Sequence, residues 1–286
     1  PAENLAEGRT YLVGLRGLVD EDGSPIGADP AFVALRDNRA SGVPEVEDQR
    51  EAMDEVFAGL AGAGVDRDEL QLAWSFTVAS ERSLSERMLH IRDDAFATLG
   101  DAAPTFEVAD VAVDPEPGVA RRISGTIEVP LYLTEDGAPG TSFNGVDEVG
   151  DLPEVNGTHQ AGFLCIVPTP ALDEPALPSL YGHGLLGSRA EVAGAGVAIG
   201  AEQNVASCAV DWIGMATEDT GNVARTLQDM SGFETIADRL QQGFLDFLWL
   251  GRAMTHEQGL VADPAFQGPD GEPLLDTGEL VFVGNS

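Results

Sequence analysis

A serine stands two residues after a glycine at the end of a short apolar segment, Val281-Phe282-Val283-Gly284-Asn285-Ser286. The apolar residues predict a strand. Gly-x-Ser is the first half of the pattern G-x-S-x-G, in which a sharp turn between a strand and a helix exposes a nucleophilic serine. Ser286 is therefore a candidate nucleophile. The alternative is a strand that ends in a polar turn without chemistry, because so short a pattern is common.

A second glycine-rich segment, Tyr181-Gly182-His183-Gly184-Leu185-Leu186-Gly187, follows the predicted strand 178–182. Glycines let a main chain approach a substrate closely and adopt strained angles. Backbone N–H groups in such a loop stabilise the oxyanion of an acyl-transfer reaction. We predict the N–H of Leu185 as one oxyanion donor, with His183 and Gly184 as loop residues. The alternative is a turn joining strand to helix, with His183 as a turn residue whose hydrogen bonds are satisfied.

The same segment also contains the spacing G-x-G-x-x-G in Gly182, Gly184 and Gly187. That spacing occurs in dinucleotide-binding loops, which pair it with an acidic residue further along the chain, and Asp211 ends the next predicted strand. A dinucleotide-binding domain is therefore an alternative. It ranks last because it leaves Gly-Asn-Ser unexplained.

Apolar periodicity predicts the elements that position these segments. Helices are expected at 46–62 and at 189–202. A further helix is expected to begin at a capping box formed by Ser83 and Glu86, and another to run from a second capping box at Ser231 and Glu234 to near Gly259. The last helix is expected to place Phe233, Ile236, Leu240, Phe244, Phe247 and Leu248 on its apolar side. Strands are expected at 10–18, 70–79, 105–113, 120–133, 159–167, 178–182, 205–211 and 279–283, and the segment 135–158 reads as a linker or long loop.

The charge of the chain is strongly acidic. It has 49 Asp and Glu against 15 basic residues, all of them Arg, for a net charge of −34. This balance argues against nucleic acid and anionic membranes as partners. A saline habitat is the preferred explanation, and an Arg-rich, GC-rich genome is the alternative. No apolar run is long enough to cross a membrane, and no signal peptide opens the chain, so we expect a processed or excised N-terminus.

Two cysteines, Cys165 and Cys208, lie in apolar strand-like runs. Two buried free thiols are one interpretation, and a disulfide in an exported protein is the other. Two cysteines alone cannot supply a four-ligand zinc site.

The order of HGLLG, then Asp211-Trp212-Ile213-Gly214, then VFVGNS resembles strands three, four and five of the α/β-hydrolase superfamily, in its lipase and esterase branch. It is similar to large exported bacterial hydrolases with a β-rich region ahead of the catalytic domain. The resemblance covers roughly 159–286, and 1–158 match only loosely. It implies an α/β fold in which an accessory α+β region, 1–158, precedes the N-terminal half of a hydrolase domain, 159–286. It also places Cys165 and Cys208 on neighbouring strands, the second and fourth.

The resemblance implies that Ser286 attacks a carboxylic ester with the help of a histidine held by an acid. In the family both partners follow the serine, whereas His90, His159, His183 and His256 all precede Ser286. We therefore expect the 286 residues to be a fragment that ends at the nucleophile turn and is inactive alone. His256, at a predicted helix C-terminus, is expected to interact with the helix dipole instead.

The resemblance implies no metal or organic cofactor, a small-molecule or lipid-like ester as substrate, and an extracellular or periplasmic location. A non-catalytic secreted binding or surface module is the alternative from another class.

Overall fold

A computed structural model describes residues 4–148 and 150–285, apart from the side chains of residues 198 and 199. The chain divides into two compact units, Pro1–Ser85 and Glu86–Ser286, which are described separately below.

The first unit combines a two-stranded sheet with three helices. The strands β1 (Thr10–Arg16) and β2 (Leu70–Thr77) are antiparallel. The helices are α1 (Pro30–Arg36), α2 (Pro44–Glu47) and α3 (Arg50–Gly62). As the periodicity predicts, α3 buries one apolar face, and it packs into a small core of Phe32, Leu35, Val56, Phe57, Leu60, Leu70 and Ala73.

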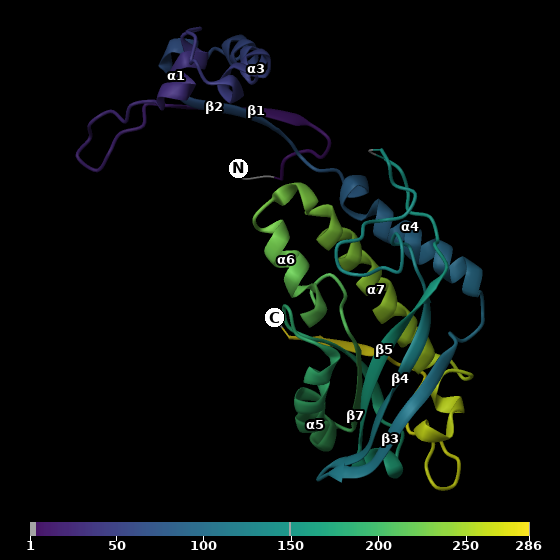
Figure 1. The fold of residues 1–286 in the computed structure, drawn as a ribbon. Coiled ribbons are helices and arrows are strands. Elements are labelled where there is room, and N and C mark those ends of the chain that lie inside the picture. Colours follow the sequence, from purple (N-terminus) through teal and green to yellow (C-terminus); the bar gives the residue numbers. More distant parts are fainter. Residues whose placement is uncertain (1–3, 149, 286) are drawn as a thin grey trace. The chain divides into compact units, whose positions relative to one another are not determined.

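The second unit is built on a six-stranded sheet with the order β3-β4-β5-β7-β6-β8 (Figure 1). The prediction of an α/β fold is confirmed. The alternation of strands and helices in residues 159–286 predicts a parallel sheet. Only β7, β6 and β8 are parallel, because β3, β4, β5 and β7 pair antiparallel. The strands are β3 (Phe106–Glu116), β4 (Val119–Pro130), β5 (Thr158–Pro168), β6 (Leu177–Gly182), β7 (Val205–Val210) and β8 (Val281–Gly284).

Helices cover both faces of this sheet. Successive side chains of a strand point to opposite faces, so Cys165 and Cys208 join the core that contains α7, whereas Ile166 and Ala209 pack with Val192 of α5. The helices are α4 (Glu81–Leu99), α5 (Val192–Gln203), α6 (Thr220–Thr226) and α7 (Glu234–Thr255). The first unit also contains the short 3₁₀ helix η1 (Arg67–Glu69). Short 3₁₀ helices of the second unit are η2 (Thr169–Leu172), η3 (Arg189–Glu191), η4 (Thr217–Asp219), η5 (Met230–Gly232), η6 (Leu260–Ala262) and η7 (Pro264–Phe266).

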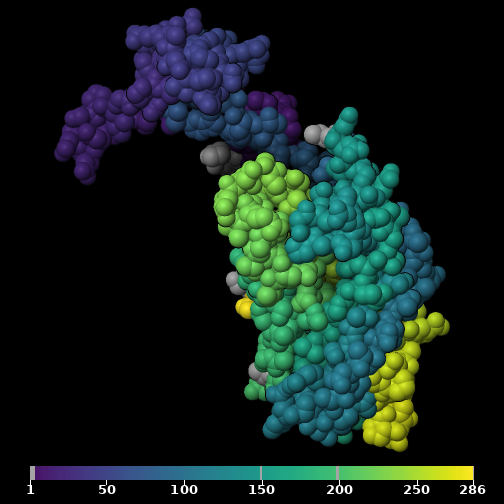
Figure 2. Space-filling model, in the orientation of Figure 1, coloured from purple at the N-terminus to yellow at the C-terminus, as the bar shows by residue number. Residues whose placement is uncertain are grey.

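The segment between β4 and β5 is irregular, as predicted, but it packs into the second unit. Phe143 N–H donates to Asp238 of α7 at 2.9 Å, and Tyr132 N–H donates to Gln242 of the same helix at 2.9 Å. Its Gly140 lies against α6, and in the surface view the teal and light-green segments are neighbours (Figure 2). The predicted division at residue 158 therefore lies inside a compact unit. That an accessory region ends and a hydrolase-like region begins at this residue stays a prediction.

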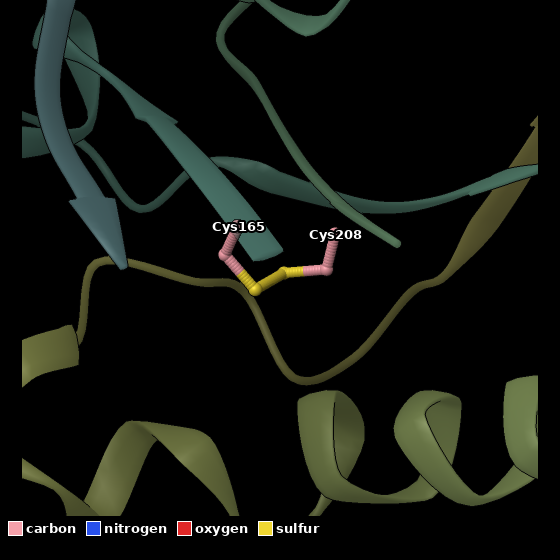
Figure 3. The surroundings of a disulfide bond; sticks show 2 residues. All are labelled: Cys165 and Cys208. Carbon is pink, nitrogen blue, oxygen red and sulfur yellow. A yellow bond between two sulfur atoms is a disulfide. The ribbon is translucent and has the colours of Figure 1, made fainter. Parts of the chain in front are cut away.

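The two cysteines form a disulfide between β5 and β7 (Figure 3). Cys165 and Cys208 stand directly opposite each other in the antiparallel ladder, and both are fully buried. The prediction of neighbouring strands is confirmed, and of the two interpretations left open by the sequence the disulfide is the correct one.

The predicted apolar side of α7 is wrong in part. Phe233, Phe244 and Leu248 are 51%, 46% and 38% exposed, whereas Phe247 is buried. The buried side carries the polar residues Asp238, Arg239, Gln242 and Asp246. Hydrophobicity alone misplaces the face because these polar groups find hydrogen-bond partners inside the unit, which removes most of the cost of burying them.

Both predicted capping boxes are also absent. Ser83 lies inside α4, where its N–H donates to the hydroxyl of Ser80. Ser231 N–H and its hydroxyl bind Asp229, and α7 begins without a side-chain cap.

Candidate active site

The end of β8 and the glycine-rich loop lie side by side at one edge of the sheet. The strand β8 runs parallel to β6 with Gly182 opposite Gly284, so the two strands end together. Beyond the strands, Asn285 N–H donates to the carbonyl of Gly182 at 2.9 Å. Ser286 itself lies outside the described residues, so its assignment as nucleophile stays a prediction.

His183 anchors the loop, and both of its ring nitrogens have hydrogen-bond partners. Its Nε2 accepts the N–H of Trp212 at 2.8 Å, so the ring hydrogen is assigned to Nδ1, which lies 2.8 Å from the carbonyl of Gly184. The side chain is buried, with 2% exposed. His183 is therefore a structural residue that joins the loop after β6 to the turn after β7, in line with its exclusion as the catalytic base.

Glu191 connects the loop to the end of β8. Its Oε2 accepts the Gly184 N–H at 3.2 Å and the side-chain amide of Asn285 at 3.1 Å. These two hydrogen bonds, with that of Asn285 the larger cause, lower the pKa of the carboxyl. A Cβ at Gly187 would fall 1.9 Å from Glu191 Oε1 and 2.9 Å from the carbonyl oxygen of Gly184, so a larger residue would displace the carboxylate. A carboxylate thus fixes the distance between the loop and the residue preceding Ser286.

Leu185 sits at the tip of this loop with its side chain 71% exposed. Within the described part of the chain, its backbone N–H has no acceptor. The next residue, Leu186, has φ +57°, and its N–H binds the carbonyl of Met215, which fixes the loop beyond the tip. The loop therefore presents one backbone donor to solvent and occupies the donors on either side of it.

The turn after β7 is tied back to the loop. Asp211 accepts the Arg189 N–H at 2.7 Å and forms an ion pair with its guanidinium. This acid is therefore occupied by Arg189, and the carboxylate of Glu191 lies inside the glycine loop. Both features disfavour the dinucleotide alternative, because a pyrophosphate would meet a negative charge in the loop.

A buried ion pair supports the same turn from α7. Asp219 accepts the N–H groups of Gly214 at 2.8 Å and Ala216 at 3.1 Å through one oxygen, and Arg239 Nε at 2.8 Å through the other. Asp219 and Arg239 are each 1% exposed, and Arg239 also binds Glu218 at 2.7 Å. Apolar periodicity does not predict this network, although the polar residues at helical spacing in α7 are a signal for it.

The other histidines bind groups elsewhere. His90 lies 3.0 Å from the carbonyl of Pro153, His256 caps the C-terminal end of α7 and lies 2.8 Å from the carbonyl of Asp101, and His159 pairs with Asp246. The predicted place of His256 at a helix C-terminus is confirmed. In residues 4–148 and 150–285, no group of three or more His, Cys, Asp or Glu side chains is placed to hold a metal ion.

Comparison with solved structures finds a distant structural likeness. No protein-family model matches the chain, and no curated protein matches it. A crystal structure from Bacteroides fragilis, described as a "putative acetyl xylan esterase", superimposes with a TM-score of 0.34 at 12% sequence identity, over 72% of this chain and 48% of that one. The chain thus spans about half the length of this neighbour. A likeness at this level defines neither the fold nor the function, which rest on the residues described above.

Among the helices that the structure describes, none has the length and apolar character needed to cross a membrane.

Proposed function

We propose that Ser286 is the nucleophile of a serine hydrolase that acts on carboxylic esters. In this proposal the serine attacks the ester carbonyl, and the exposed N–H of Leu185 donates to the oxyanion as the tetrahedral intermediate forms. Gly184 lets the loop approach Asn285 closely, because a Cβ at this position would lie 3.4 Å from the side-chain amide of Asn285. A histidine oriented by an acid takes the proton from the serine hydroxyl and passes it to the leaving alcohol.

The observation that carries the proposal is the hydrogen-bonded link between the two loops. Glu191 binds both Gly184 N–H and Asn285 Nδ2, so the residues flanking the proposed donor and the proposed nucleophile share one carboxylate. A backbone donor without an acceptor, beside the strand end that leads to Ser286, is one part of what acyl transfer requires.

The proposal needs a catalytic histidine from outside residues 1–286. His183 uses both ring nitrogens, and His90 and His256 bind carbonyl groups elsewhere in the fold. His159 lies on β5, which two other strands separate from β8 in the sheet. We therefore expect the 286-residue chain alone to hydrolyse esters only at the background rate, because a serine hydroxyl is a poor nucleophile without a base.

The test compares the natural protein, the 286-residue chain and two serine variants. Hydrolysis of p-nitrophenyl acetate by the natural protein should fall about 10³-fold or more in Ser286→Ala. It should be unchanged in Ser231→Ala, an exposed serine of the same unit. A fluorophosphonate probe should label the natural protein but not Ser286→Ala. Full activity or labelling in Ser286→Ala would show that the nucleophile is another residue.

The disulfide supports an extracellular or periplasmic location as part of this proposal. Disulfides persist in oxidising compartments and are rare in the cytosol of mesophiles. Cys165 and Cys208 form one, and no described cysteine is free.

A further inference from the structure

A separate cavity of about 570 Å³ lies in the second unit, at the same edge of the sheet but beside β4, β5 and the turn after β7. Its walls come from the first residues of β5, the loop residues 136–139, the turn after β7 and the buried side of α7. Because β5 runs antiparallel to β7, the start of β5 lies beside the carboxyl end of β7. The volume is within the range of about 300–1,000 Å³ that is typical of sites for small organic ligands.

A histidine and an aspartate on the cavity wall each have an unused polar atom. His159 Nε2 lies 2.9 Å from Asp246 Oδ1, and that oxygen also accepts the amide of Gln242 at 3.2 Å. Asp246 is fully buried, and its Oδ2 has no hydrogen-bond partner in the structure. Within the described residues, His159 Nδ1 also has no partner, and the ring is partly exposed. An unpaired buried carboxylate oxygen is costly, which favours a ligand that brings a hydrogen-bond donor to it.

Most of the remaining charged groups on the wall are already paired. Arg189 pairs with Asp211, and Arg239 pairs with Glu218. Only Asp136, among the charged residues that line the cavity, has no ion-pair partner in the described chain. The wall is therefore dense in hydrogen-bonding groups, while most of its charges are locally compensated.

This pairing distinguishes between classes of ligand. An anion is disfavoured because it would meet four carboxylates in a chain of net charge −34. An apolar group is disfavoured because it would remove water from the ion pairs without replacing the hydrogen bonds to that water. A cation would find one carboxylate that is not already paired. Hydroxyl groups both donate and accept hydrogen bonds, so a polyol can satisfy Asp246 Oδ2, His159 Nδ1 and the free lone pairs of the paired carboxylates together.

We propose that this cavity binds a neutral polyhydroxylated molecule, a sugar or related polyol, through Asp246 and His159 on one wall and the Arg189–Asp211 pair on another. The proposal does not rest on the proposed esterase function. It requires only the second unit, in which all the lining residues lie.

The experiment is a titration of the 286-residue chain, labelled with ¹³C at Cε1 of its histidine rings. The chain has four histidines, so the spectrum contains four signals, which single His→Gln variants assign. The probes are maltose, cellobiose and lactose as neutral sugars, putrescine as a cation and citrate as an anion, each up to 100 mM. We expect at least one sugar to shift the His159 signal saturably and to leave the His256 signal in place.

The variants locate the binding. Asp246→Asn should weaken the sugar affinity about tenfold or more, since a hydrogen bond to a charged group is lost. Asp211→Asn tests the other wall of the cavity, and it replaces Asp246→Asn in the experiment if that variant does not fold. Asp101→Asn, an exposed aspartate of the same unit, should leave the affinity unchanged. Binding of putrescine or citrate alone, sugar binding that spares the His159 signal, or no binding of any probe would overturn the proposal.

Discussion

Removing the disulfide should destabilise the second unit by about 4 kcal/mol. The bond joins residues separated by 43 positions, Cys165 and Cys208. The loop-closure relation −2.1 − 1.5R ln n gives about −13 cal/mol/K for such a loop, which is about 4 kcal/mol at 25 °C. Both sulfur atoms are in the core, so the double variant Cys165→Ala/Cys208→Ala also loses packing, and about 4 kcal/mol is the value expected for the cross-link alone.

The assay is urea unfolding followed by tryptophan fluorescence. The chain has three tryptophans, of which Trp74 is in the first unit and Trp212 and Trp249 are in the second. A Trp74→Phe background therefore reports the second unit alone. In that background the double cysteine variant should unfold at a lower urea concentration, with a loss of at least about 4 kcal/mol. Dithiothreitol should destabilise the parent protein in the same way.

The control for this assay is the double cysteine variant with and without dithiothreitol, which should not differ. Two free thiols in the denatured, unreduced parent protein would refute the disulfide itself. A loss below about 1 kcal/mol with an intact disulfide would refute the loop-closure reasoning, because the denatured chain would then gain little freedom from its removal.

Two further changes test the polar groups of α7. Burial alone lowers the pKa of His159, but the charge and hydrogen bond of Asp246 outweigh burial and raise it. The stabilisation from protonated His159 is fully present below its unfolded pKa of about 6.5, and it is lost as pH rises through its higher pKa in the folded protein. The variant His159→Gln should therefore show a smaller fall in the free energy of unfolding above about pH 6.5. Arg239→Met should cost about 3–5 kcal/mol in urea unfolding because it leaves Asp219 buried without its cation, whereas Arg252→Met, which breaks no ion pair among the described residues, should cost less than about 1 kcal/mol. An unchanged pH profile in the first case, or equal losses in the second, would contradict these assignments.

Segments with strong local patterns were predictable from the sequence. The strand β7 is a continuous run of apolar and small residues, and the apolar residues of α3 recur at helical spacing, so both elements form close to their predicted places. The glycine loop and the turn after β7 were also recognisable, because each follows a buried strand.

Groups whose partners are distant in the sequence could not be predicted. Asp238 and Gln242 are on the buried side of α7 because they bind backbone N–H groups of Phe143 and Tyr132, and nothing local to the helix indicates this. The role of Glu191 is similar, since one of its partners, Asn285, lies far along the chain. Hydrophobic periodicity describes the cost of burying a polar group, but not the partner that removes this cost.

The two candidate sites share one structural support, the turn that follows β7. Asp211 holds Arg189 at the cavity, and the N–H of the next residue, Trp212, holds His183 in the proposed oxyanion loop. The arrangement follows from topology: β6 and β7 are parallel neighbours, so the loops that leave them emerge at the same edge and must pack against each other. A ligand in the cavity and an ester at Leu185 would therefore both depend on this turn. Sugar binding that survives Ser286→Ala, together with ester hydrolysis that does not, would show that this edge holds two separate sites.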